Sequence, residues 1–220
     1  MTKSLPLAGQ VALIPLTALG LRAHKGGAVA VALAIEAGEP RVLVSGTLET
    51  SAAGDRLSLE PYRVAAEMPR DPQGQASAEA AAAVAEGRRR QDQIAAGSLQ
   101  GLVRQLEDAG GSPVVAALLV NRAGWVTDLL SYSLAWPEHA AVADGLAVRE
   151  ALRFACGQCA VEVAELDEKS LPELASKTLG LSGDEIDARL KALGEAVARP
   201  WRKEQKLACV AAWVAIAGRR

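Results

Sequence analysis

Apolar residues at the start of the chain fall into short runs that predict a β-sheet. Residues 11–16 and 28–35 are almost wholly apolar, and each run is too short for most helices. Residues 41–48 alternate between apolar and other side chains, after a Gly and a Pro in the segment 36–40. We therefore predict three successive strands, the last two forming a hairpin, with a polar Gly-rich turn at 22–27 between the first two.

The middle of the chain is predicted to contain a long helix and another buried strand. Apolar residues recur at three- and four-residue spacings through 76–109, and two glycines at 110–111 end this helix. Residues 114–120 are nearly all aliphatic, which is typical of a buried parallel strand. Residues 52–75 are rich in Gly, Pro and charge, so we predict a long connection there, with a short edge strand around 57–59.

The last third is predicted to be mostly helical. After a loop through Ser131 and Tyr132, a helix begins near Pro137 and runs to about residue 155. An edge strand then follows over 159–166, where apolar residues alternate with glutamates.

Three further helices complete the predicted chain. Serine–glutamate capping boxes at 170–173 and 182–185 indicate two short helices, and a final helix covers 203–217. No internal repeat divides the sequence, so residues 1–220 are predicted to form a single domain.

Composition narrows the classes of function. Half of the 220 residues are hydrophobic, which is enough for a substantial core, but only 3% are aromatic, so an extended base-stacking surface is not expected. The formal net charge of -2 gives no general attraction to phosphate backbones, and any contact with nucleic acid must be local.

The location of the protein is predicted from apolar run length and cysteine count. No run reaches the roughly 20 residues of a membrane helix, so no membrane association is expected. Residues 3–21 loosely imitate a secretion signal, but Gln10 and Pro15 interrupt them and a strand explains them equally well. Three cysteines do not make a disulfide framework, and the pair Cys156 and Cys159 is interpreted as small buried residues. We therefore predict a cytoplasmic protein.

The order of these elements resembles the ribonuclease H-like superfamily, and specifically bacterial Holliday-junction resolvases. The resemblance extends along the whole chain, and residues 19–50 resemble the opening of a resolvase. It implies an α/β fold: a mixed five-stranded sheet flanked by helices, with extra C-terminal helices. In that family an aspartate on the first strand, an acid ending the fourth strand and acids opening the last helix hold two metal ions for phosphodiester hydrolysis.

The residues at those positions depart from the family pattern. The first-strand aspartate position falls on Arg22, the fourth strand ends in Val120 and Asn121, and near the last helix only Glu204 remains. Two-metal catalysis needs several oxygen ligands, and an arginine at the central position repels the metals. We therefore predict a bacterial protein with a degenerate nuclease site and no cofactor, which binds nucleic acid, a partner protein or a second copy of itself.

Candidate site residues follow from the predicted fold, in which the ends of the first and fourth strands lie side by side. The predicted binding residues are Arg22, Lys25, Asn121, His139, Arg149 and Lys206. Arg22, Lys25 and Arg149 with the amides of Gly26 and Gly27 are an anion pocket in one interpretation. In the other, Arg149 pairs with Asp144 or a carboxylate near Glu150, and Arg22 only ends a strand.

The alternative function is a metal-dependent phosphoester hydrolase with a displaced active site. Its catalytic residues would be Asp144, Glu204 and His24. A single zinc, manganese or iron ion held by these three and His139 is chemically reasonable, although no HxH or HExxH spacing supports it. Ordinary surface histidines are the competing interpretation.

Overall fold

A single mixed sheet forms the centre of the structure, a computed structural model that describes residues 16–121, 126–197 and 199–219. The first three strands are an antiparallel meander, and the last two run parallel to the first, in the order β3-β2-β1-β4-β5. The strands are β1 (Leu16–His24), β2 (Gly27–Glu36), β3 (Glu39–Glu49), β4 (Ser112–Val120) and β5 (Glu162–Asp167).

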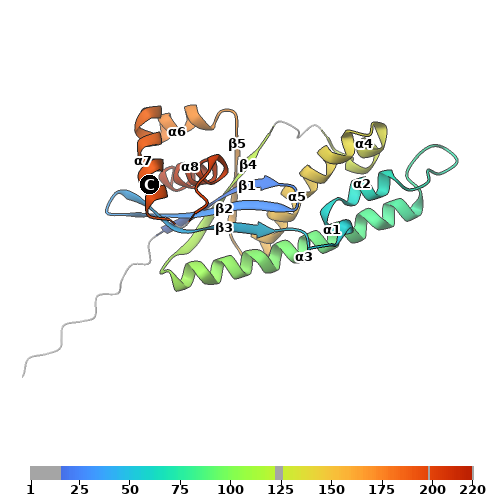
Figure 1. The fold of residues 1–220 in the computed structure, drawn as a ribbon, viewed down its shortest axis with the longest axis horizontal. Helices are drawn as coiled ribbons and strands as arrows, with labels where there is room; N and C mark the ends of the chain where they lie inside the picture. The colour runs from blue at the N-terminus through green and yellow to red at the C-terminus, as the bar shows by residue number, and fades with distance from the viewer. Residues whose placement is uncertain (1–15, 122–125, 198, 220) are drawn as a thin grey trace, which may run out of the picture.

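Helices cover both faces of this sheet, and a group of short helices extends beyond its end (Figure 1). The helices are α1 (Arg56–Leu59), α2 (Pro61–Ala66), α3 (Ala78–Asp108), α4 (Leu129–Ala135), α5 (His139–Gln158), α6 (Leu171–Leu179), α7 (Gly183–Glu195) and α8 (Lys203–Ala217). None of them, within the ranges described, has both the length and the apolar character that crossing a bilayer requires.

Side chains that alternate along the strands divide the hydrophobic core between the two faces of the sheet. Ala18 of β1 and Ala117 of β4 belong to the cluster formed with α6, α7 and α8. Leu19 and Leu118, one position further along the same strands, belong to the cluster formed with α3 and α5. Successive residues of a strand point to opposite faces, so β1 and β4 are buried on both sides.

The backbone of α8 lies directly on β1. A Cβ atom added to Gly20 would stand 1.7 Å from the carbonyl oxygen of Ala208 and 3.1 Å from the amide nitrogen of Ala212. Both alanines are fully buried. Only a residue without a side chain at position 20 permits this approach of helix and strand.

Most of the long predicted elements are confirmed. The hairpin strands, the long helix, the parallel fourth strand and the edge strand all lie within a few residues of their predicted bounds, and the predicted final helix coincides with α8. The capping box at Ser182 is confirmed, since its hydroxyl accepts the Glu185 amide and the Glu185 carboxylate accepts the Ser182 amide. Ser170 makes no side-chain cap, although α6 does begin directly after it.

The first strand extends further along the chain than predicted, because the prediction ended it at residue 16. β1 begins at Leu16, and the predicted turn at 22–27 contracts to Lys25 and Gly26. The predicted residues 11–15 lie outside the described ranges. The apolar pattern did not predict residues 17–24 as strand because Gly20, Arg22 and His24 interrupt it, and packing against α8 accommodates Gly20.

The interpretation of residues 52–75 was also wrong, because two short helices replace the predicted edge strand. The Asp55 carboxylate accepts the Leu57 amide at 3.1 Å and caps α1. The buried Gln91 of α3 donates its amide to the Ser58 carbonyl at 2.8 Å. Such long-range bonds are not visible in local sequence. The predicted loop through Ser131 and Tyr132 is likewise mostly helix α4.

The contact between α8 and β1 predicts that a single methyl group added at position 20 strongly destabilises the fold. Gly20→Ala should lower the free energy of unfolding by about 3 kcal/mol, because either the strand or the helix backbone must move. Gly46→Ala in β3 is the control, since a Cβ there meets no heavy atom within 4 Å, and it should change stability by less than about 1 kcal/mol. Chemical denaturation measures both, and equal effects would refute the assigned contact.

Candidate functional site

A cavity opens at the carboxyl end of β1, on the side of the sheet covered by α5. Its volume is about 280 Å³. The lining comes from the end of β1, from the segment around α1 and α2, and from α5. Its polar and charged residues are His24, Lys25, Glu60, Arg63, Asp144 and Arg149. Four of these were predicted site residues, from segments far apart in the sequence.

Arg22, on the strand beside this cavity, forms a two-pronged ion pair with Glu168. Its Nε lies 3.2 Å from Oε2 and its Nη2 lies 3.0 Å from Oε1. The Glu168 amide donates to the Val120 carbonyl at 3.0 Å, which fixes this glutamate beside the end of β4. The parallel arrangement matches the fork of the guanidinium to the carboxylate, and it neutralises Arg22.

Lys25 is also paired with a carboxylate. Its Nζ donates to Glu60 Oε2 at 2.7 Å, and Arg56 Nε donates to the other oxygen at 2.7 Å. The Glu60 side chain is only 11% exposed. Hydrogen bonds from Lys25 and then Arg56 hold the pKa of Glu60 below its usual value.

Asp144 of α5 is buried and caps another helix. Its Oδ1 accepts the Tyr62 amide at 2.9 Å, in the first turn of α2. The N-cap residue of α2, Glu60, makes no side-chain cap, so Asp144 satisfies a backbone donor that α2 itself leaves free. Burial raises the pKa of Asp144 to about 6, against the opposing effect of hydrogen bonds from the Tyr62 and Arg63 amides.

Arg149 is the cation of this cavity that lacks a carboxylate partner among the described residues. Its Nη1 donates to the amide oxygen of Asn121, at the end of β4. Its Nε is buried and has no hydrogen-bond partner. Burial, followed by the nearby Arg153, lowers the pKa of Arg149. The predicted pairing with Asp144 or Glu150 is wrong, because Asp144 caps α2 and Glu150 pairs with Arg88.

The anion pocket suggested by the sequence is therefore assembled differently from the expectation. Arg22 and Lys25 lie near the end of β1, but each faces a carboxylate. Gly26 supplies a turn with φ of 81°. Arg149 lines the cavity and has no carboxylate partner among the described residues, so it is the group best able to bind an incoming anion.

The four proposed metal ligands are not brought together. His24 is exposed, with Nδ1 2.9 Å from its neighbour's carbonyl. The ring of His139 stacks on Tyr132 at a centroid distance of 4.0 Å. Glu204 lies in the first turn of α8, on the other face of the sheet from Asp144. Over the described ranges, no three His, Cys, Asp or Glu side chains are grouped so that they could hold a metal ion.

The remaining predicted binding residue, Lys206, lies on α8 and lines a different cavity, between α6, α7 and α8. Two acids that pair with predicted site residues, Glu60 and Glu168, were not predicted from the sequence. Glu60 falls in the segment mistaken for a connection, where Pro61 was the available sign of a helix start. Glu168 directly follows β5, and nothing local links it to Arg22.

Comparisons with solved structures identify the fold. The chain is similar to a structure titled "Thermus thermophilus RuvC structure", with a TM-score of 0.51, 11% identity, and coverage of 93% of this chain and 95% of that one. It is also similar to "T. thermophilus RuvC in complex with Holliday junction substrate", with a TM-score of 0.53, 10% identity and the same coverages. No protein-family model and no curated protein sequence matches. The chain has a ribonuclease H-like fold, as the resemblance implied.

The raised pKa of Asp144 predicts a pH-dependent difference between the wild type and Asp144→Asn. From pH 4 to 6 the folded protein holds a proton that the unfolded chain has released, so the contribution of Asp144 to stability falls as the pH rises. Relative to the variant, the wild type should lose roughly 2 kcal/mol of unfolding free energy between pH 4 and pH 7. Denaturant titrations across this range measure the difference.

Asp128→Asn is the matched control for this titration. Ser131 donates to the Asp128 carboxylate and lowers its pKa, so the difference there should have the opposite sign. A flat difference for Asp144→Asn, or one that grows in favour of the wild type as pH rises, would contradict the assigned burial of the charge.

Proposed function

We propose that this chain binds duplex or branched DNA through the surface at the carboxyl ends of β1 and β4, and that it does not cleave the DNA. We define this carboxyl-end surface by Arg22, His24, Lys25, Asn121 and Arg149. The observation that carries the proposal is the Arg22–Glu168 ion pair. It occupies the place on the first strand where the resolvase resemblance implies a metal-binding aspartate.

The chemistry of the residues present supports binding without two-metal hydrolysis. Two closely spaced divalent cations require several oxygen ligands. Here a guanidinium replaces the first acid, the amide of Asn121 follows β4, and both oxygens of Glu168 already accept hydrogen bonds from Arg22. The ion pair thus leaves no free carboxylate among the described residues at this point to hold a metal, and Arg149 is the nearby cation that remains for an anion.

Phosphate is the anion that the fold and the surface together favour. The solved complex of T. thermophilus RuvC contains a Holliday junction substrate. Arg149 lines the cavity and has no carboxylate partner among the described residues, and Lys25 is 62% exposed despite its bond to Glu60. With a net charge of -2 over the whole chain, binding must come from this local cluster. The three free cysteines fit a bacterial cytoplasm, which we propose as the setting.

Arg149→Ala tests this proposal. Fluorescence anisotropy with a labelled four-way junction, and with a linear duplex of equal length, should show binding that weakens as salt increases. The variant should bind about five- to tenfold more weakly at moderate salt. The slope of log affinity against log salt should decrease in magnitude by about 1, which corresponds to the loss of one phosphate contact. Incubation with magnesium or manganese should leave both DNAs intact.

Arg153→Ala is the control, since Arg153 lies one turn further along α5 and pairs with Glu165. It should alter the affinity by less than about twofold. Thermal unfolding of both variants separates lost contacts from lost structure. Cleavage of either DNA, absence of salt-dependent binding, or equal losses in the two variants would each refute the proposal.

A further inference from the structure

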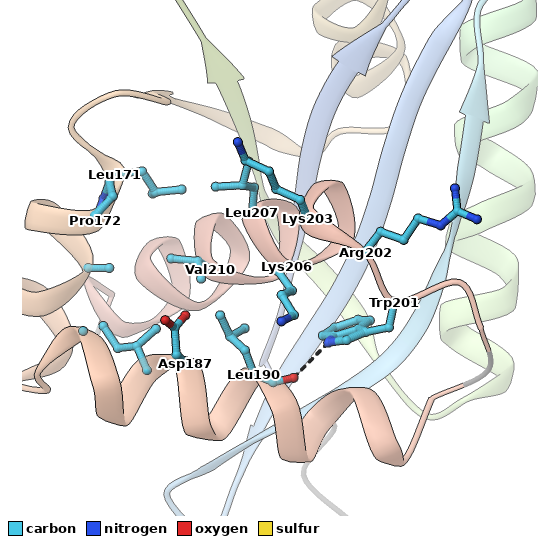
Figure 2. Close-up of a pocket in the computed structure, with 13 residues that line it drawn as sticks. Leu171, Pro172, Asp187, Leu190, Trp201, Arg202, Lys203, Lys206, Leu207 and Val210 are labelled. Carbon is cyan, nitrogen blue, oxygen red and sulfur yellow. Dashed lines mark hydrogen bonds between the residues drawn. The ribbon is translucent and has the colours of Figure 1, made fainter.

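A second concave surface combines an apolar floor with a cationic rim, along the seam between α7 and α8 (Figure 2). Two cavities of about 500 Å³ and 480 Å³ share Trp201, Arg202 and Lys206 as lining residues. They adjoin along these side chains, and we call the combined hollow the α7–α8 groove. It is formed by elements separate from the carboxyl-end cavity and shares no lining residue with it.

The floor of the α7–α8 groove consists of core side chains from three helices. Leu171 of α6, Ile186 and Leu190 of α7, and Val210 of α8 are each at most 7% exposed. Leu207 is half-buried beside them. Their surface toward the groove is apolar and matches the lining of pockets that accept an aliphatic or aromatic side chain.

Trp201 forms a fixed wall of this groove. Its Nε1 donates to the Leu190 carbonyl at 2.8 Å. Its ring lies so close to α7 that a Cβ on Gly194 would stand 2.1 Å from it. The indole is thus held against α7 in a set orientation, with Lys206 directed alongside it (Figure 2). A preformed wall lowers the ordering cost of binding.

Positive charge predominates around the groove. The cationic lining residues are Lys191, Arg199, Arg202, Lys203 and Lys206, against the acids Asp187 and Glu195. None of these seven appears in an ion pair with another described residue, whereas most arginines near the carboxyl-end surface do. This excess of free cations lies on a chain whose net charge is -2. The groove is therefore complementary to a negatively charged molecule with an apolar part.

We propose that the α7–α8 groove binds a short acidic segment of a partner protein that carries one or two large apolar side chains. The apolar side chains enter the cavity over Ile186 and Leu190, while the carboxylates pair with Lys203, Lys206 and Arg202 at the rim. Burial of an apolar anchor ringed by charge pairs is a common arrangement in peptide recognition. A nucleic acid has the charge but no aliphatic side chain for this floor.

Three fluorescein-labelled peptides test the proposal on the full chain. A peptide of repeated Asp-Asp-Leu should bind, whereas one of repeated Asp-Asp-Ser and one of repeated Lys-Lys-Leu should each bind at least about tenfold more weakly. Lys206→Glu should weaken binding of the Asp-Asp-Leu peptide about tenfold. Lys177→Glu, on α6 and outside the groove, carries the same charge change and should alter affinity by less than about twofold.

Each alternative outcome overturns a stated part of the proposal. Equal binding of the Asp-Asp-Ser peptide would show that the apolar floor does not contribute to affinity. Equal binding of the Lys-Lys-Leu peptide would show that the cationic rim does not contribute. Tighter binding of single-stranded oligothymidine, lost in Lys206→Glu, would assign the groove to nucleic acid. Thermal unfolding of Lys206→Glu tests whether this variant is folded. Failure of every peptide to bind would refute the proposal, and it would not bear on DNA binding at the carboxyl-end surface.

Discussion

The close contact between α8 and β1 is the constraint on which the rest of the architecture depends. Because Gly20 has no side chain, the helix backbone reaches the strand, and small residues such as Ala208 and Ala212 fill the interface. α8 is apolar almost all round, so its outward side must also be covered. The helices α6 and α7 provide this cover, and the seam that they leave against α8 is the groove with the cationic rim.

The same contact also orients α8 relative to the carboxyl ends of the strands. Arg219, just after α8, pairs with Glu162 at the start of β5, so α8 runs opposite in direction to the parallel strands. The first turn of α8 therefore lies toward the carboxyl ends of β1 and β4. One edge of the molecule collects the paired Arg22, the capping Asp144 and the incompletely bonded Arg149.

Long elements were predictable from the sequence because their periodicity extends over many residues, as in α3 and α8. The ends of the first and fourth strands were also expected to lie side by side, as they do, and the predicted site residues His24, Lys25, Asp144 and Arg149 line one cavity. The short helices around Ser58 were missed because contacts with α3 hold them. The partner of Arg22 could not be predicted, since Glu168 lies 146 positions away and only the folded sheet brings the two together.

The pairing of Arg22 with Glu168 also restricts the evolutionary routes open to this surface. An acid in place of Arg22 alone would set two carboxylates against each other, and loss of Glu168 alone would leave a guanidinium without its counter-charge. Either intermediate is less favourable than the present state or than a double replacement. Replacement of Arg22 by an acid thus requires coordinated changes, and in descendants of this chain positions 22 and 168 should vary together.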